Sequence, residues 1–176
     1  MVTGRDGAEE RGSGYLVRAG VVLTAAHVVR DVRSVRVRFN HRESDEQTVC
    51  CGADSVLVAA GGDVAVVVLP AGAGPESVEP AGFGRVSRRA AVLPCQVVGF
   101  PRFKLKADAP CPEGAGAGGS WFRDRAQVEG RIPVLANSKE GTLEVLTEPP
   151  ADDLDATRSP WEGMSGAAVW AADGAH

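Results

Sequence analysis

The 176-residue sequence is poor in aromatic residues, with three Trp, one Tyr and five Phe. Because large aromatic side chains are scarce, valine, alanine and leucine must fill the core. The sequence also lacks any run of 18 apolar residues, which excludes a transmembrane helix. Its net charge is only −4, which gives no reason to expect nucleic acid or an anionic membrane surface as a partner.

Cysteine is scarce as well, and its spacing is not that of a metal site. Cys50 and Cys51 are adjacent, whereas Cys95 and Cys111 lie far along the chain; pairs of zinc ligands are usually separated by about two to four residues. We expect no metal and no organic cofactor, and reduced thiols that are mostly structural. A bridge between Cys95 and Cys111 is expected only in an oxidising compartment.

The first residues, 1–11, are interpreted as an N-terminal extension. They contain no apolar core of the kind that a secretion signal requires. Together with the small number of cysteines, this absence predicts a cytoplasmic location.

Glycine and proline are frequent, with 22 Gly and 11 Pro, and they separate short valine-rich segments. Many short apolar or alternating segments between turn residues predict an all-β barrel or sandwich. The expected strands are Tyr15–Arg18, Val21–Leu23, Val35–Phe39, Val56–Ala60, Val64–Leu69, Ala91–Leu93, Gln96–Phe100, Ala126–Gly130, Thr142–Leu146 and Ala167–Trp170.

One stretch, at about residues 101–125, is predicted to be a flexible loop rich in glycine and proline. Its centre at residues 114–119 reads Gly-Ala-Gly-Ala-Gly-Gly and offers little side-chain area to bury. Two interpretations stay open: a regulatory loop, or a segment without a function of its own.

Three polar residues lie in short motifs that suit nucleophilic catalysis. Ser165 stands in Gly-Met-Ser-Gly at 163–166, His27 ends Thr-Ala-Ala-His, and Asp63 follows two glycines and opens Asp-Val-Ala-Val. A serine hydroxyl is a poor nucleophile until a base removes its proton, and a histidine oriented by an aspartate is a common base. Each residue also has a plainer interpretation: a packed histidine, a turn aspartate and a tight bend.

The three motifs occur in the order His, Asp, Ser, with Asp63 following His27 by 36 residues and Ser165 following Asp63 by 102. With the segment Gly12–Val17, they resemble the chymotrypsin-like (trypsin-like) serine peptidases, and most closely the bacterial intracellular and HtrA-like members. The resemblance runs from about Gly12 to the last residue.

This resemblance implies two antiparallel Greek-key β-barrels with the active site in the cleft between them. Residues 12–90 would form the first barrel and carry His27 and Asp63. Residues 91–176 would form part of the second barrel and carry Ser165.

The resemblance also implies a serine endopeptidase that works through an acyl-enzyme. Ser165 would attack the substrate carbonyl, His27 would take and return its proton, and Asp63 would hold the imidazole tautomer. The backbone N–H groups of Gly163 and Ser165 would form the oxyanion hole. In the trypsin branch an acid six residues before the nucleophile binds Lys or Arg; Ser159 stands there, so a basic substrate residue is not favoured.

Two neighbours of these positions also carry expectations. Val28 occupies the position where secreted relatives have a bridged cysteine, which agrees with a cytoplasmic protein. For Glu162 two interpretations stay open: a contribution of charge to substrate specificity, or a place in a solvated acidic loop, which is the expected one.

In the family, further strands follow the nucleophile strand and close the second barrel, whereas here an Asp-Gly turn at 173–174 is followed by two residues. We therefore expect the chain to be the protease domain of a larger regulated protein, or a partner or second copy to complete the sheet, because open sheet edges invite association.

The expected partner is a protein or peptide substrate. One alternative is a catalytically silent or incomplete peptidase-like module that binds peptides or serves assembly. Another is an esterase with the same triad, although the strand pattern lacks the alternating strands and helices of an α/β-hydrolase.

Overall fold

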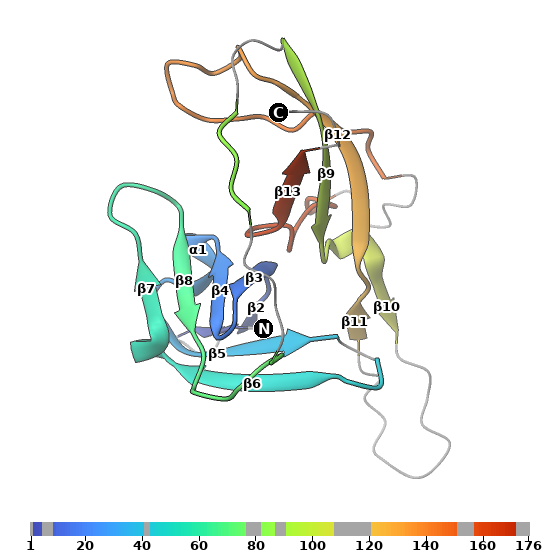
Figure 1. Cartoon of the computed structure of the whole chain (residues 1–176). Coiled ribbons are helices and arrows are strands. Elements are labelled where there is room, and N and C mark those ends of the chain that lie inside the picture. The colour runs from blue at the N-terminus through green and yellow to red at the C-terminus, as the bar shows by residue number, and fades with distance from the viewer. Residues whose placement is uncertain are drawn as a thin grey trace. The chain divides into compact units, whose positions relative to one another are not determined.

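The computed structural model describes residues 2–4, 9–40, 43–76, 82–86, 91–107, 121–150 and 157–171, and these residues are mostly β-strand (Figure 1). The chain forms two compact units, which are described separately. Unit 1 comprises Met1–Arg85 and Ser165–Ala168; unit 2 comprises Val86–Met164 and Val169–His176.

Unit 1 contains two four-stranded antiparallel sheets. One has the order β3-β4-β8-β7, with strands β3 (Gly14–Arg18), β4 (Val21–Thr24), β7 (Val56–Val58) and β8 (Ala65–Val68). The other has the order β2-β1-β5-β6, with strands β1 (Val2–Gly4), β2 (Glu9–Glu10), β5 (Val32–Phe39) and β6 (Gln47–Gly52). A single helical turn, α1 (Ala26–Val29), follows β4, and a 3-10 turn, η1 (Ala53–Ser55), follows β6.

The hairpin of β3 and β4 shows how the sequence specifies this local structure. Gly20 in the turn has a φ of 74°, a conformation that glycine adopts without a steric penalty. The pairing sets Tyr15 opposite Leu23. Both strands and their turn confirm the pattern expected at residues 15–23.

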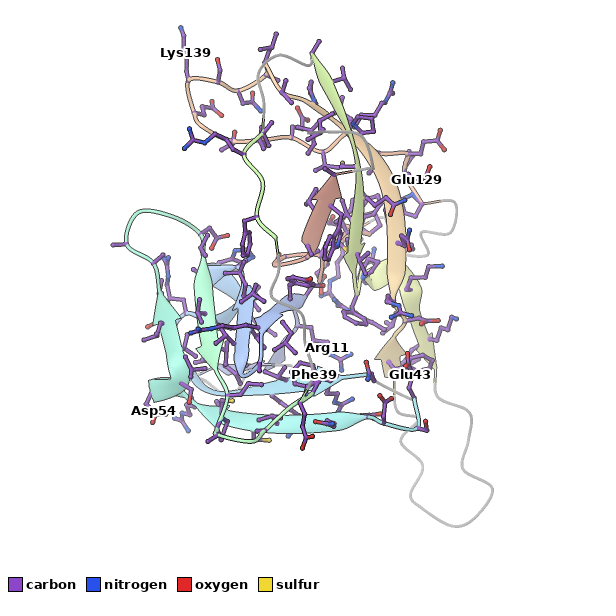
Figure 2. The ribbon with its side chains drawn as sticks, in the orientation of Figure 1. Arg11, Phe39, Glu43, Asp54, Glu129 and Lys139 are labelled. Carbon is purple, nitrogen blue, oxygen red and sulfur yellow. The ribbon has the colours of Figure 1, made fainter. Side chains whose placement is uncertain are left out.

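The core of unit 1 consists of small aliphatic side chains, as the shortage of aromatic residues predicts. Both sheets and α1 contribute to it, and each fully buried valine or leucine contributes roughly 1.5–3 kcal/mol to stability. Phe39, at the end of β5, is only partly buried and packs against this core (Figure 2). The buried members are Val22, Ala25, Ala26, Val28, Val29, Val32, Val35, Cys51, Ala65, Val67 and Leu69.

Unit 2 is built on a long antiparallel strand pair. β9 (Val92–Gly99) pairs with β12 (Ala126–Pro133) along its whole length, and β13 (Ala168–Ala171) flanks the other side of β9. A 3-10 turn, η2 (Arg102–Lys104), leads into a second strand pair, β10 (Leu105–Ala107) and β11 (Trp121–Arg123). The core is small, with buried Cys95, Ile132 and Val134 and partly buried Val86, Leu93 and Val145.

The structure corrects several expectations about unit 2. The strands expected at 91–93 and 96–100 are one strand, β9, because β12 pairs with every residue from 92 to 99, including Pro94 opposite Arg131. The strand expected at 142–146 is wrong: Leu146 alone forms a bridge, with Arg131, through backbone hydrogen bonds of 2.8 and 2.9 Å.

The sequence pattern did not predict β1, β2, β6, β10 or β11. The last two lie within the stretch expected to be a flexible loop, so the ends of that stretch, 102–107 and 121–123, form regular structure. Residues 108–120 of this stretch, with Cys111, lie outside the described residues.

The all-β class is confirmed, whereas no sheet among the described residues closes on itself. The two Greek-key barrels and the boundary at residue 90 therefore stay predictions. None of the helices in the described part of the chain is long and apolar enough to cross a membrane.

Candidate active site

His27 and Asp63 lie at the same end of the strand pair formed by β4 and β8. Thr24, the last residue of β4, pairs with Ala65, the first residue of β8. From Thr24 the chain runs into α1, whose second residue is His27, and Asp63 ends the turn between β7 and β8. The antiparallel register therefore brings together two residues that are 36 positions apart.

The single turn of α1 also explains why the His27 side chain is accessible. Its neighbours Ala26, Val28 and Val29 are buried in the core of unit 1, whereas His27 is exposed. The packing of these three apolar side chains fixes the backbone from which the imidazole projects.

The Asp63 carboxylate makes two hydrogen bonds with His27. The backbone N–H of His27 donates to Oδ1 at 2.8 Å, and Nδ1 of the ring lies 2.5 Å from Oδ2. About half of each side chain is exposed, 57% for His27 and 54% for Asp63. The carboxylate is thus held against both the backbone and the ring of the same histidine.

These contacts also set the charge of the pair. The hydrogen bond from the His27 backbone N–H, followed by the bond from its ring, holds the pKa of Asp63 below its ordinary value. Asp63 is therefore ionised at neutral pH and can only accept, so Nδ1 carries the shared proton. In a neutral imidazole this leaves the lone pair on Nε2, which is the arrangement a general base needs.

Ser165 is anchored within unit 1 by its backbone. The Ser13 N–H, just before β3, donates to the Ser165 carbonyl at 2.8 Å. The Ser13 carbonyl in turn accepts a buried hydrogen bond of 2.7 Å from the Thr24 hydroxyl. The segment Ser165–Ala168 belongs to unit 1, and the assignment of Ser165 to a second barrel stays a prediction.

Gly166 brings this segment into very close contact with the end of β4. Its φ is 82°, and a Cβ placed on it would lie 2.2 Å from the Ser13 carbonyl oxygen, 2.5 Å from Thr24 Oγ1 and 2.9 Å from the Ala25 nitrogen. Only a residue without a Cβ fits, which gives a physical reason for the glycine after Ser165. Two of these three neighbours, Ala25 and Thr24, precede His27 by two and three positions.

The structure thus pairs His27 with Asp63 and anchors Ser165 beside the segment that leads to His27. Within the described part of the chain, however, the Ser165 hydroxyl forms no hydrogen bond with His27. The second contact expected of a triad is therefore not formed in this structure.

A comparison of the chain with known protein families gives a match over most of its length. The family described as "Trypsin-like peptidase domain" matches residues 12–175. The chain belongs to this family. No curated protein and no solved structure matches the chain.

In this trypsin-like peptidase domain, Gly163 lies in a tight turn two residues before Ser165. Gly163 is buried and has a φ of 94°. A Cβ at this position would lie 2.1 Å from Arg123 Nη1 and 2.6 Å from the Phe100 carbonyl oxygen. The glycine of the motif is therefore required by its backbone conformation and by its neighbours.

Ser159 begins the same turn, and its polar atoms are used there. Its hydroxyl accepts a hydrogen bond of 3.3 Å from the Trp161 N–H, and its carbonyl accepts from Arg102 Nε at 3.1 Å. Trp161 packs edge-on against Phe103, with ring centroids 5.2 Å apart. The expected role of Ser159 in substrate binding stays a prediction.

Sequence reasoning missed Arg123, which contacts the turn from β11, and it placed Glu162 in a solvated acidic loop. The Glu162 carboxylate instead binds Arg123 at 2.8 Å and Arg158 at 2.6 Å. Burial by itself would raise the pKa of Glu162, but the Arg123 hydrogen bond and the charge of Arg158 outweigh it and hold the pKa below its ordinary value. No spacing in the sequence marks this pair, because its partners lie 39 positions apart.

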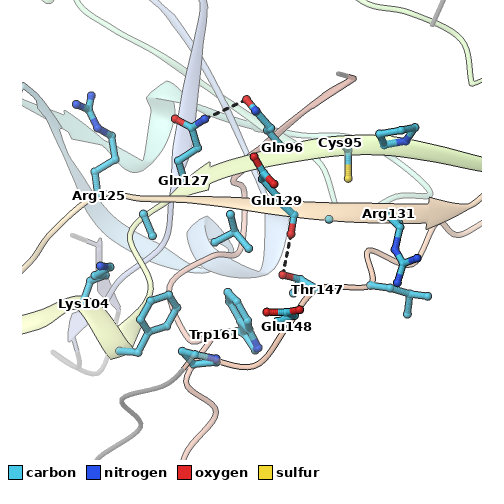
Figure 3. Close-up of a pocket in the computed structure, with 17 residues that line it drawn as sticks. Cys95, Gln96, Lys104, Arg125, Gln127, Glu129, Arg131, Thr147, Glu148 and Trp161 are labelled. Carbon is cyan, nitrogen blue, oxygen red and sulfur yellow. Dashed lines mark hydrogen bonds between the residues drawn. The ribbon is translucent and has the colours of Figure 1, made fainter. Parts of the chain in front are cut away.

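Unit 2 of the peptidase domain also contains a pocket of about 1090 Å³, formed largely by residues of β9 and β12 (Figure 3). Gln127 donates to Gln96 at 3.1 Å, and Thr147 donates to the Glu129 carbonyl at 2.9 Å. The charged lining residues are Lys104, Arg125, Arg131, Glu129 and Glu148. Because both signs of charge are present, the lining does not favour a ligand of one charge.

The thiols and acidic groups of the described residues do not form a metal site, since no cluster of three or more His, Cys, Asp or Glu side chains with suitable geometry occurs there. Cys50, Cys51 and Cys95 are free thiols. Burial is the main cause that raises the pKa of Cys51 and of Cys95. These two cysteines therefore behave as buried apolar side chains.

Proposed function

We propose that this trypsin-like peptidase domain is a serine endopeptidase whose catalytic residues are His27, Asp63 and Ser165. The observation that supports the proposal most strongly is the double contact between His27 and Asp63. It occurs at the strand end beside which the Ser165 segment is anchored.

The proposed reaction starts with the attack of Ser165 Oγ on the scissile carbonyl carbon, while His27 Nε2 takes the hydroxyl proton. Asp63, ionised by its contacts with His27, stabilises the imidazolium that forms. His27 then gives the proton to the leaving amine, which breaks the peptide bond and leaves an acyl-enzyme. Attack by water, again with His27 as base, releases the acid product.

The backbone N–H groups of Gly163 and Ser165 are assigned the role of stabilising the negative charge that develops on the substrate oxygen. Each such donor typically contributes on the order of 100- to 1000-fold in rate. The reaction needs neither a metal ion nor an organic cofactor. The primary specificity residue is proposed to be Ser159 in place of an acid, so substrates with a basic residue have no special advantage.

A second candidate function is supported by one observation. Among the described residues the Ser165 hydroxyl makes no hydrogen bond with His27, as expected of a catalytically silent or incomplete module that binds peptides or serves assembly. The paired His27 and Asp63 favour the enzyme, because a module that only binds peptides needs no such pair.

Three further expectations are kept as proposals. The similarity to bacterial intracellular and HtrA-like members is carried by the sequence motifs. A cytoplasmic location is supported by the free thiols, since reduced cysteines are typical of a reducing compartment. A role as one domain of a larger regulated protein, or completion of the second barrel by a partner, also stays a prediction.

Labelling with a fluorophosphonate probe, measured by intact mass, tests the proposal. We expect a single adduct on the wild type and none on Ser165→Ala. Ser138→Ala is the matched control, because Ser138 is an exposed serine that has no part in the mechanism; it should label like the wild type. If the folded wild type forms no adduct, the silent module becomes the better assignment.

A further inference from the structure

The turn before Ser165 contacts a largely buried cation of unit 2. Arg123, the last residue of β11, has a side chain that is only 10% exposed. Its Nη1 donates to the Glu162 carbonyl at 3.0 Å and its Nη2 donates to Glu162 Oε1 at 2.8 Å. A charge removed from water is costly without a partner. Here the guanidinium binds both the backbone carbonyl and the carboxylate of Glu162.

Two more arginines complete the set of contacts around Glu162. The backbone N–H of Arg102 donates to the same carbonyl at 2.8 Å, and Arg158 Nη2 lies 2.6 Å from Oε2. The carbonyl thus accepts two hydrogen bonds, and each carboxylate oxygen has its own cation. Glu162 is therefore fixed more firmly than a solvated acidic loop would require.

The orientation of the Glu162 carbonyl determines that of the next N–H group. A trans peptide is planar, so its C=O and N–H point in opposite directions, and no cis peptide occurs in the described residues. The N–H group of this peptide belongs to Gly163. Donors that bind the carbonyl from one side therefore direct the Gly163 N–H toward the other side.

Arg123 also limits the alternative conformations of this peptide. Its Nη1 occupies the space beside the Gly163 Cα, where a Cβ would lie only 2.1 Å away. A rotation of the peptide would break the hydrogen bond from Nη1 and leave the largely buried guanidinium without the Glu162 carbonyl. Arg123 Nε is already buried without a hydrogen-bond partner among the described residues, so the loss of a second contact would add to the desolvation cost.

We propose that Arg123 is a positioning residue for catalysis: by binding the Glu162 carbonyl and carboxylate, it holds the Gly163 N–H in the direction that the oxyanion requires. This inference deepens the proposed function and depends on it for its catalytic part. Arg123 acts through the peptide of Glu162 and Gly163, without touching the reacting atoms.

The test compares Arg123→Met, Arg123→Lys and a matched control, Lys106→Met. Lys106 lies on the neighbouring strand β10 and also pairs with a carboxylate, that of Asp124 at 2.9 Å, but this pair is about half exposed. For each variant, the rate constant of covalent modification by the fluorophosphonate at saturation is measured separately from the probe affinity.

A misdirected oxyanion donor slows the chemical step and leaves the probe affinity unchanged. We expect Arg123→Met to lower the saturated labelling rate about 10- to 100-fold, below the loss typical of complete removal of a donor. Arg123→Lys, which keeps a cation, should recover part of this loss, and Lys106→Met should match the wild type. A wild-type rate in folded Arg123→Met would overturn the proposal.

A second measurement is independent of activity: the amide resonance of Gly163 and its hydrogen exchange. Arg123→Met should shift this resonance and speed its exchange, whereas Lys106→Met should not. If the wild type fails to label while Gly163 responds in this way, the proposed function fails and the structural part of the inference stands. If the Gly163 amide is unchanged, the inference is wrong whatever the labelling shows. Should Arg123→Met not fold, Arg123→Lys provides the same comparisons.

Discussion

Replacement of Gly166 by alanine tests the packing that anchors Ser165. The new Cβ would lie 2.2 Å from the Ser13 carbonyl oxygen and 2.5 Å from Thr24 Oγ1. A positive φ costs a residue with a Cβ about 1–2 kcal/mol, and overpacking in a tight site typically costs about 1–3 kcal/mol. We therefore expect Gly166→Ala to lower the free energy of unfolding by roughly 2–5 kcal/mol.

The same substitution at Gly20 separates these two contributions. Gly20 also belongs to unit 1 and has a φ of 74°, but a Cβ there would meet nothing within 4 Å. Gly20→Ala should therefore show only the conformational cost of about 1–2 kcal/mol. The difference between the two variants, about 1–3 kcal/mol, is the cost of the close contact with Ser13 and Thr24.

Urea unfolding measures this difference. With a denaturant slope of about 1–3 kcal/mol/M for a small protein, the midpoint of Gly166→Ala should lie clearly below that of Gly20→Ala. Gly166→Ala should also lose fluorophosphonate labelling under conditions where it is still folded, because Ser165 moves with its neighbour. Equal midpoints for the two variants would refute the packing described for the Ser165 segment.

Two further variants test the paired residues and the buried hydrogen bond. Asp63→Asn should lower the labelling rate by about 10⁴-fold, because the amide presents the wrong His27 tautomer; a rate near that of the wild type would exclude the triad. In the wild type, the pKa of Asp63 is lowered, so its contribution to stability is present above the ordinary aspartate pKa and is lost as the pH falls through the lowered value. Asp63→Asn should therefore flatten the acid side of a plot of Tm against pH. Thr24→Val removes the buried donor to the Ser13 carbonyl and should lower the free energy of unfolding by about 1–3 kcal/mol. Thr147→Val removes an exposed donor to the Glu129 carbonyl and should lower it less. Similar losses for the two variants in urea unfolding would contradict the burial of the Thr24 bond.

Local patterns in the sequence predicted much of unit 1. The short apolar segments around Gly20 and the strand at 35–39 follow from period-two alternation and from a glycine in the turn. These signals depend on neighbouring residues only, so they can be read without knowledge of the fold. The same holds for the aliphatic core, which the shortage of aromatic residues requires.

The structure of unit 2 was harder to predict from the sequence because its strands depend on distant partners. Pro94 suggests a break between two strands, yet β12 pairs with the whole segment and makes it one strand. Thr142–Leu146 has the residue types of a strand, but only Leu146 finds a partner. Whether a segment becomes a strand was decided by the availability of a neighbouring backbone edge.

The sequence by itself determined the candidate residues His27, Asp63 and Ser165, the glycines beside the serine, and the all-β class. The tertiary structure decided how these residues are held. It paired His27 with Asp63 through the β4–β8 register, grouped Ser165 with unit 1, and placed Arg123 against the turn that contains Glu162. The reason is physical: conformational preference and motif chemistry depend on adjacent residues, whereas hydrogen bonds between residues 36 or 39 positions apart exist only after the chain has folded.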